Sequence, residues 1–207
     1  LGILIDEKLS WKSHIAMIST KISKTTGLLS KLKYYLPGNV LFMIYNSLIL
    51  SYLSYGNIVW SNISPKLKPL FLLQKRCLRY CTNSHYLAHS KPLFRQLNTL
   101  NIYSLNKYQN AVFVFKCIKG NAPSSFATMF QTNSKIHKYN TRNSLKLHIW
   151  NIDKQYLQQS VRYTGPTVWN SLPSSVTQYV YLNSFKKKKK KNALYFRALF
   201  LLVFRLY

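Results

Sequence analysis

The sequence is poor in acidic residues: its 207 positions hold three carboxylates, Asp6, Glu7 and Asp153, against 30 lysines and arginines. So few carboxylates cannot at once form a paired acid–base catalyst, a cage for a hard metal ion and structural ion pairs. The net charge of +27 leaves most cations without an intramolecular partner, and their repulsion opposes a compact monomer. Because 47% of the residues are hydrophobic, the chain is still expected to fold. Its partner should then be a polyanion: DNA, RNA or an anionic membrane surface.

Cysteines and long apolar runs are also scarce. The three cysteines, Cys77, Cys81 and Cys117, are an odd number, which favours reduced thiols and an intracellular setting in the nucleus or the cytoplasm. No stretch of 18 uninterrupted apolar residues occurs, so no transmembrane segment is predicted. The chain opens at Leu1 rather than at a methionine, and we interpret it as a piece of a longer protein.

Two cysteines and two histidines, Cys77, Cys81, His85 and His89, follow one another at a constant spacing of four, which suggests a zinc hypothesis. On one continuous helix each step of four advances about 6 Å and turns about 40°, so four such ligands cannot meet one tetrahedral ion. Zinc binding would need a break in the helix after Cys81. We favour the alternative that Cys77 and Cys81 are small buried hydrophobic residues, and we expect no metal or other cofactor in this chain.

Helical spacing of apolar residues dominates the chain up to about residue 130. Ser10 is expected to cap a first helix whose apolar positions recur at steps of four and three: Trp11, Ile15, Ile18, Ile22, Thr25, Leu29 and Leu32. Pro37 and Gly38 end it. The nearly all-apolar stretch 39–55 predicts a buried helix, and further helices are predicted over 65–81, after Pro92 and over 104–119. Residues 1–5 are typical of a short buried strand.

The character of the sequence changes after Gln131, where polar residues become dense and helical spacing fades. Leu145, Leu147 and Ile149 alternate with polar residues, which predicts a strand. Gly165-Pro166 is expected to interrupt regular structure. The predicted fold is therefore mainly α, with a helical bundle followed by an irregular, mixed α/β basic region. We divide the chain into a strand end, the bundle, the basic region and a lysine run with an apolar tail, over residues 1–7, 8–130, 131–185 and 186–207.

Several phrases, taken in order, resemble one family. The opening LGILIDEKLSWKSHI and the following KISKTTGLLSKLKYYLP are followed by IYNSLILSYLSYG, a VW pair, LQKRCLRY and HSKPLFRQLNTLNI. The later phrases HKYNTRNSL, GPTVWNSLP and FKKKKKK continue the same order. Together they are similar to the region after the palm in the reverse transcriptases of LINE-type (non-LTR, Jockey-like) retrotransposons. The likeness extends to about residue 190. The apolar tail beyond it departs from the family pattern, and we interpret it as translation past the proper end of the element.

The resemblance implies a thumb-like helical bundle, followed by the post-thumb region of an RNA-directed DNA polymerase that acts in target-primed retrotransposition. In this family palm aspartates, in a Tyr/Phe-Ala-Asp-Asp motif, hold the catalytic magnesium ions, and this chain lacks that motif. A fragment without the palm should not polymerise alone, because two-metal phosphoryl transfer needs those carboxylates. The implied role is sequence-independent binding of template–primer nucleic acid, RNA or an RNA–DNA hybrid, beside the rest of the polymerase polypeptide.

Cations on the predicted helices are the first candidates for this role, since Lys and Arg neutralise phosphates without reading bases. They lie on the first helix at Lys21, Lys24, Lys31 and Lys33, and on the third at Lys75, Arg76 and Arg79. If about six phosphates are contacted, log K should fall against log salt with a slope of about −5. The alternative is that each is simply a solvated side chain.

A second candidate set is the basic aromatic stretch of Lys138, Tyr139, Asn140, Thr141 and Arg142. There a tyrosine can stack on a base and an arginine can pair with a phosphate. The alternative is a structural loop in which Arg142 bonds backbone carbonyls. Trp169, in the phrase GPTVWNSLP, is expected to anchor a packing corner rather than to stack on a base.

Two other functions stay open. Lys186–191 beside the apolar residues 193–207 could make the chain a membrane-surface protein. The chain could also be the non-functional relic of a decayed element, whose lysine run comes from translating an adenine-rich stretch.

Overall fold

The computed structural model describes residues 2–62, 64–126, 128–137, 139, 142–173, 177 and 184–186. The helices in these residues confirm the prediction of a mainly α fold. Over the first hundred residues the order is α1 (Lys12–Leu32), α2 (Gly38–Ile44), the π-helix η1 (Tyr45–Leu50), α3 (Ser51–Ser54), α4 (Asn57–Trp60), the 3-10 helix η2 (Ser64–Leu67), α5 (Lys68–Cys81) and α6 (Ser90–Gln96). Then follow α7 (Ile102–Ile118), the 3-10 helix η3 (Ser124–Phe126), α8 (Asn133–Ile136), α9 (Gln155–Gln158) and α10 (Val161–Asn170).

The chain forms two compact units, which we describe separately. The first contains the residues up to Leu105, and the second begins at Asn106, so α7 starts in one and continues in the other. The composition-based boundaries at residues 7, 130 and 185 are not tested by this division and stay predictions. Residues 187–207, which hold most of the lysine run and the apolar tail, lie outside the described residues.

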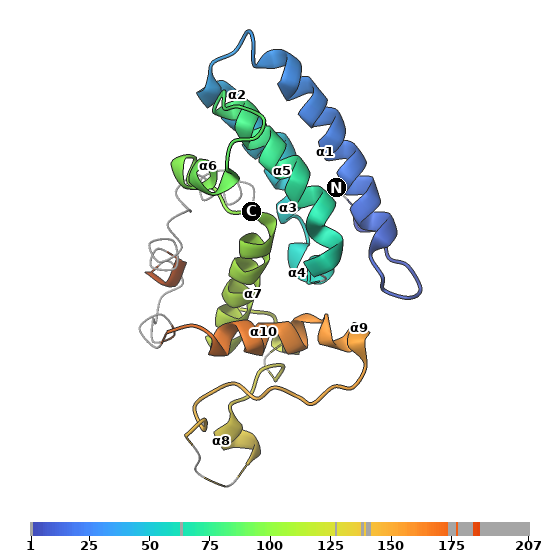
Figure 1. Cartoon of the computed structure of the whole chain (residues 1–207). Coiled ribbons are helices and arrows are strands. Elements are labelled where there is room, and N and C mark those ends of the chain that lie inside the picture. Colours follow the sequence, from blue (N-terminus) through green and yellow to red (C-terminus); the bar gives the residue numbers. More distant parts are fainter. Residues whose placement is uncertain are drawn as a thin grey trace. The chain divides into compact units, whose positions relative to one another are not determined.

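Three helical segments build the first unit: α1, the continuous α2–η1–α3 segment and α5 (Figure 1). The helices α1 and α5 pack lengthwise and run in the same direction. At the N-terminal ends of the two helices the Lys66 ammonium donates to the Ser10 carbonyl at 2.8 Å. Toward their C-terminal ends Thr26 Oγ1 lies 3.1 Å from Cys77 Sγ. The α2–η1–α3 segment runs in the opposite direction and closes the core with buried aliphatic side chains from all three segments.

The start of α1 corrects two sequence predictions. Residues 2–5 form no strand, and Ile5 is 72% exposed, because no other described strand lies beside them to pair with. Ser10 is also not the main cap. The Asp6 carboxylate accepts the backbone N–H groups of Ser10 and Trp11, both at 2.8 Å. Hydrogen bonds from Ser10, and then from Trp11, lower the pKa of Asp6.

The core face of α1 agrees with the predicted spacing, with one shift. The aliphatic side chains of Ile15, Ile18, Ile22 and Leu29 are buried, whereas Thr26 rather than Thr25 faces the core. The Thr26 hydroxyl donates to the Ile22 carbonyl at 2.7 Å, which satisfies its polar group in the interior.

The second predicted helix is helical throughout but buried on one face only. Leu41, Tyr45 and Ile49 are buried, whereas on the other side Met43 is 66% exposed and Leu48 is also exposed. The prediction of an all-round buried helix was therefore wrong, because the first unit supplies partners for one side of this segment only. Gly56, with φ of 56°, ends the segment as predicted.

The predicted third helix is confirmed as η2 followed by α5, with Pro65 in the 3-10 turn and Pro69 in the first turn of α5. Gln74 is the one fully buried polar side chain of α5. Its Nε2 donates to the Tyr45 hydroxyl at 2.7 Å and to the Leu100 carbonyl at 2.8 Å, and its Oε1 accepts the Ile102 N–H at 3.1 Å. This amide therefore ties α5 to η1 and to the start of α7.

The second unit is organised by α10, which runs through Gly165 and Pro166 where the sequence predicted an interruption. Pro166 has no N–H for the helical hydrogen bond and its ring crowds the carbonyl four residues back, so α10 accommodates this proline at a cost in stability. Gly165 is buried against Val114 and Phe130, where a larger residue would not fit. Trp169 packs with Phe115 and Phe185, so its role as a packing anchor is confirmed.

The predicted strand around Leu147 is absent from the described part of the second unit, which has a single antiparallel bridge between Thr132 and Leu147. The Asn170 side chain takes the place of a neighbouring strand: its Oδ1 accepts the Leu147 N–H at 3.0 Å and its Nδ2 donates to the Leu147 carbonyl at 2.8 Å. The backbone N–H and carbonyl of Leu147 are therefore hydrogen-bonded by one side-chain amide rather than by a neighbouring strand.

Candidate nucleic-acid interface

The cations of α1 fall into two groups. Lys21, Lys24 and Lys31 are exposed and are spaced by three and seven residues, which places them along one side of the helix over about 15 Å. Lys33, at the end of the helix, lies on the opposite side and its Nζ is 5.4 Å from the ring centroid of Tyr80 on α5. The structure therefore places three of the four predicted lysines on one outward stripe.

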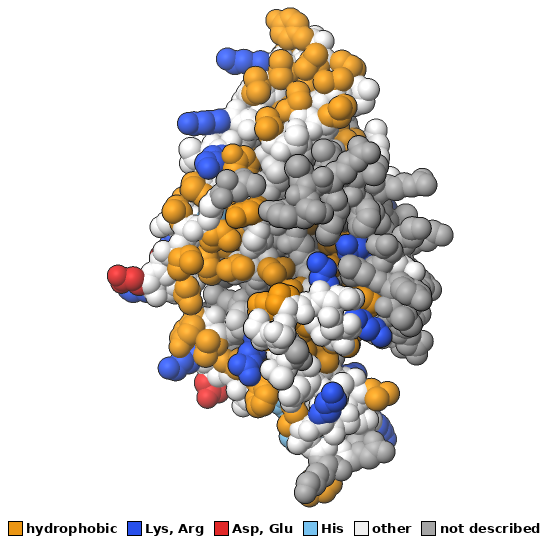
Figure 2. All heavy atoms as spheres, turned by 180° about the vertical axis from the view of Figure 1, so that it is seen from behind, with side chains coloured by type: hydrophobic (Ala, Val, Ile, Leu, Met, Phe, Trp, Pro, Cys, Tyr) orange, Lys and Arg blue, Asp and Glu red, His pale blue; other side chains and the backbone are white. Residues whose placement is uncertain are grey.

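The cations of α5 share one outward side. Lys75, Arg76 and Arg79 lie away from the buried positions of the helix, and exposed Lys68 falls on the same side at a spacing of seven from Lys75. Sequence reasoning missed Lys68, although its spacing could have identified it. With three carboxylates in the whole chain, almost none of these charges can be neutralised internally. Figure 2 shows one face of the molecule, with scattered Lys and Arg side chains and few acidic groups.

Contacts within the unit already occupy some of these cations. The Arg79 Nε donates to the Ala88 carbonyl at 3.0 Å and so fixes the loop after α5. The Lys75 Nζ lies 4.2 Å from the ring centroid of Phe71, a cation–π contact that leaves the ammonium hydrogens able to meet a phosphate. Arg76, Lys24 and Lys31 are exposed and are the strongest candidates for phosphate contacts.

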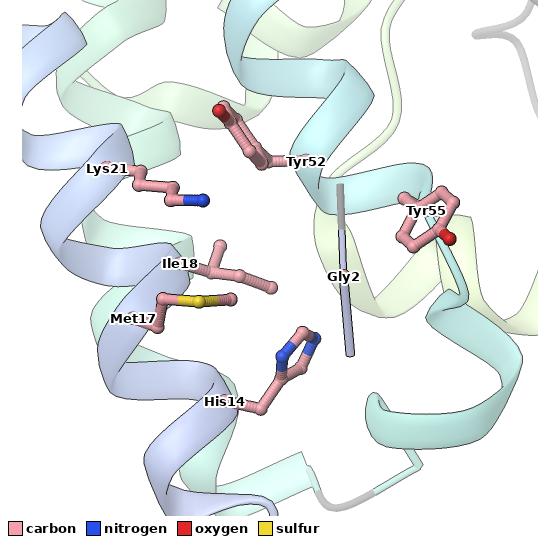
Figure 3. Close-up of a pocket in the computed structure, with 7 residues that line it drawn as sticks. All are labelled: Gly2, His14, Met17, Ile18, Lys21, Tyr52 and Tyr55. Carbon is pink, nitrogen blue, oxygen red and sulfur yellow. The ribbon is translucent and has the colours of Figure 1, made fainter. Parts of the chain in front are cut away.

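Lys21 borders a small cavity of about 10 Å³ between α1 and the end of the α2–η1–α3 segment (Figure 3). Its Nζ lies 5.3 Å from the ring centroid of Tyr52, and His14, Met17 and Tyr55 face the same space. The volume is about that of a single water site, so the cavity cannot accept a phosphate group. Lys21 can therefore contact nucleic acid only at the outer rim.

His14 is the buried polar group of this cavity, with 1% of its surface exposed. Its Nδ1 accepts the Leu4 N–H at 3.3 Å, which leaves the proton of the neutral ring on Nε2, and its ring meets Trp60 edge-on at 5.4 Å. Nε2 has no hydrogen-bond partner in the described part of the chain. Burial, and then the positive charge of Lys21, lowers the pKa of His14.

The second candidate set belongs to the second unit. Tyr139 is 82% exposed, and Arg142 is also exposed at the start of a turn. Both are accessible to a nucleic acid, and the two interpretations of this loop stay open. Lys138, Asn140 and Thr141 lie outside the described residues.

A row of three aromatic rings and one arginine in the second unit escaped the sequence analysis. Arg162 on α10 lies 5.6 Å from the Trp150 ring centroid, and His148 meets Trp150 edge-on at 4.8 Å. His148 also lies 5.4 Å from His137 between ring centroids. These residues come from segments separated by ten or more positions, so no local spacing could have identified the row.

The cysteines are core residues, as predicted. Cys77, Cys81 and Cys117 are buried, and burial raises the pKa of Cys77 to about 11 and of Cys81 to about 12. Both thiols are therefore protonated at neutral pH, as is usual for buried structural cysteines. Among the described residues no group of three or more His, Cys, Asp or Glu could hold a metal ion. Both carboxylate oxygens of Asp6 are already used in capping α1.

No helix in the described residues has the length and apolar character required to span a bilayer. Comparison with known proteins gives no match: no family model, curated protein or solved structure is similar to this chain at a significant level.

Proposed function

We propose that this chain is the thumb and post-thumb part of a LINE-type retrotransposon reverse transcriptase, and that its own role is to hold template–primer nucleic acid without reading its sequence. The ordered phrases of the sequence support the family, and the helical first unit is compatible with a thumb-like clamp. The partners would be RNA or an RNA–DNA hybrid and the remainder of the polymerase. Magnesium would be held by palm aspartates that this sequence does not contain.

The observation that carries the proposal is the pair of outward cationic sides on α1 and α5, in a chain of 30 cations and three carboxylates. Such surfaces neutralise phosphates on a regular backbone and add no base-specific contact. The exposed cations are held on two helices that pack against each other, so the spacing of the cations along each helix is fixed.

The direct test is binding of the full chain to an RNA–DNA hybrid and to single-stranded RNA over a salt series. We expect preference for the hybrid and a slope of log K against log salt of about −5, for about six phosphate contacts. Replacing Lys24 and Lys31 by Gln should reduce the steepness of this slope by about 2.

The matched control replaces two exposed lysines of the second unit, Lys135 and Lys146, by Gln, with the same loss of charge. We expect a smaller change than in the α1 variant. Equal changes in both variants, or equal affinity for the hybrid and for heparin, would mean that net charge alone governs binding and would contradict the proposal. Removal of residues 186–207 tests the membrane alternative. Loss of lipid-vesicle binding with unchanged RNA binding would assign a membrane role to these residues, independent of the role in nucleic-acid binding.

A further inference from the structure

A cavity of about 340 Å³ lies in the first unit, between α5, α6 and the loop that leads into α7. Its volume is at the lower end of the range for small-molecule sites. The rings of Phe71 and Phe94 both line it, nearly parallel at 20° with centroids 6.2 Å apart, but Phe94 is buried, with 5% of its surface exposed. Tyr103 meets Phe71 edge-on at 5.3 Å and holds that ring in place. The partly exposed Phe71 ring is therefore the surface on which a flat aromatic ligand can stack.

The charge around the cavity selects an anionic ligand. Exposed Lys91 lines the cavity. The three carboxylates of the chain, Asp6, Glu7 and Asp153, are not among the lining residues. A ligand with a planar ring and an attached phosphate matches both the Phe71 ring and the Lys91 ammonium.

The polar side of the cavity is preorganised. Asn101 Oδ1 accepts the backbone N–H of Ser104 at 2.8 Å, which fixes the amide and leaves its N–H₂ group as a donor, and the Ser90 and Ser104 side chains also line the cavity. The loop itself is held from behind by Gln74, which bonds the backbone on both sides of Asn101. Hydrogen-bonding groups on a fixed loop can meet the edge of a base without rearranging.

We infer that this cavity takes one unpaired nucleobase of a single-stranded nucleic acid, stacked on the Phe71 ring with its phosphate at Lys91. The inference rests on the proposed function and deepens it, because it adds a stacking contact to a surface otherwise described by charge. Base stacking tolerates any base, so this site keeps the binding sequence-independent.

The test uses the full chain and two single-stranded DNA oligomers of equal length: one carries 2-aminopurine at a central position, the other has an abasic residue there. We expect the 2-aminopurine oligomer to bind about tenfold more tightly, with quenched fluorescence. Phe71→Leu should abolish the difference and leave affinity for the abasic oligomer unchanged. Lys91→Gln should weaken both oligomers equally.

Because Phe71 contributes to packing, a second variant fills the cavity from the other side. Ser104→Leu should remove the quenching while leaving the unfolding midpoint near that of the parent chain. Salt-dependent binding of both oligomers with equal affinity and no quenching would overturn the cavity assignment and leave the proposed function standing. Quenching that survives in both variants would overturn the cavity assignment. If the chain binds the oligomers no more tightly than it binds heparin, both the cavity assignment and the proposed function are overturned.

Discussion

The two units satisfy their buried polar groups in different ways. In the first, the fully buried amide of Gln74 joins three helical segments through Tyr45, Leu100 and Ile102. In the second, the half-buried amide of Asn170 replaces a missing strand beside Leu147. One amide strengthens an arrangement that helix packing already favours, whereas the other creates an arrangement that packing alone would not produce.

The hydrophobic cores differ in the same sense. The first unit buries many aliphatic side chains from long helices, together with Tyr45 and Trp60, whereas the second depends on a few aromatic rings, with Phe115 and Phe185 stacked at 4.4 Å and Trp169 beside them. Where long helices supply most of the buried surface, the effect of a single substitution should be distributed over the whole unit. Where a few rings and one amide hold the loops, a single change should act locally.

The largest expected effect is that of Gln74→Ala. It leaves the Tyr45 hydroxyl, the Leu100 carbonyl and the Ile102 N–H unpaired in the core, and it opens a cavity. We expect a loss of about 3–5 kcal/mol in the free energy of unfolding, measured by urea denaturation. Gln96→Ala, at the exposed end of α6, is the matched control and should change stability by less than about 0.5 kcal/mol. A loss below about 1 kcal/mol for Gln74→Ala would show that this amide does not hold the unit together.

Asn170→Ala should have the next largest effect. It removes both hydrogen bonds to the Leu147 backbone, and we expect a loss of about 2 kcal/mol. Hydrogen exchange should locate the effect, with faster exchange at Leu147 and unchanged protection in α1 and α5. Equally faster hydrogen exchange in both units would contradict the prediction that this substitution acts locally. Asn170→Asp, which keeps the acceptor for the Leu147 N–H, should recover part of the protection.

A pair of glycine substitutions compares the units directly. An added Cβ at Gly165 would lie 2.9 Å from Val114 Cγ2 and 3.2 Å from the Phe130 ring, so Gly165→Ala should destabilise the protein by about 1–2 kcal/mol. Gly27, exposed in the middle of α1, has no atom within 4 Å of the same position. Gly27→Ala should therefore stabilise the protein by about 0.5–1 kcal/mol. Thermal unfolding of both variants checks the opposite signs, and equal signs would contradict the comparison.

The smallest expected effect concerns pH. Because the folded pKa of His14 lies below its ordinary value of 6.5, the unfolded chain takes up the proton first. The stability from neutral His14 is then complete above pH 6.5 and falls as the pH drops below it, until the folded pKa is passed. Denaturation midpoints between pH 5 and 8 should show this fall, and His14→Asn should flatten it. The exposed His85→Asn is the control, and an equal flattening there would refute a special role for His14.

Much of the first unit was predictable, because helix periodicity depends on residues three and four apart. The presence of helices at α1 and α5 and the burial of Cys77 and Cys81 followed from such spacing. The end of α1 did not, because it lies at Leu32, and Gly38, which was expected to end this helix, begins α2. The choice between Thr25 and Thr26 did not, since a 3.6-residue period allows either position. The exposure of Met43 also could not be predicted, because an apolar sequence does not show how many partners a fold provides.

The second unit was harder to predict, because its contacts join distant residues. Leu145, Leu147 and Ile149 have the alternation of a strand, yet the partner of Leu147 is a side chain 23 positions away. Of the candidate site, three of the four lysines of the first helix and the cations of α5 could be placed on outward sides from spacing alone, whereas Lys33 could not. The cavity beside Phe71 could not, since three separate elements line it.

The π-helix η1 has a consequence for insertions and deletions. A π-helical turn holds about one residue more than an α-helical turn, and here the Ser47 hydroxyl donates to the carbonyls of Met43 at 3.0 Å and Ile44 at 3.2 Å. Deleting one residue from an ordinary helix rotates everything beyond it by about 100° and misplaces the buried face. Loss of exposed Ser47 would instead let the segment rewind as a regular α-helix, with Leu41 and Leu53 still directed into the core. We therefore expect the first unit to tolerate the loss of one codon here and to keep the register of its buried face.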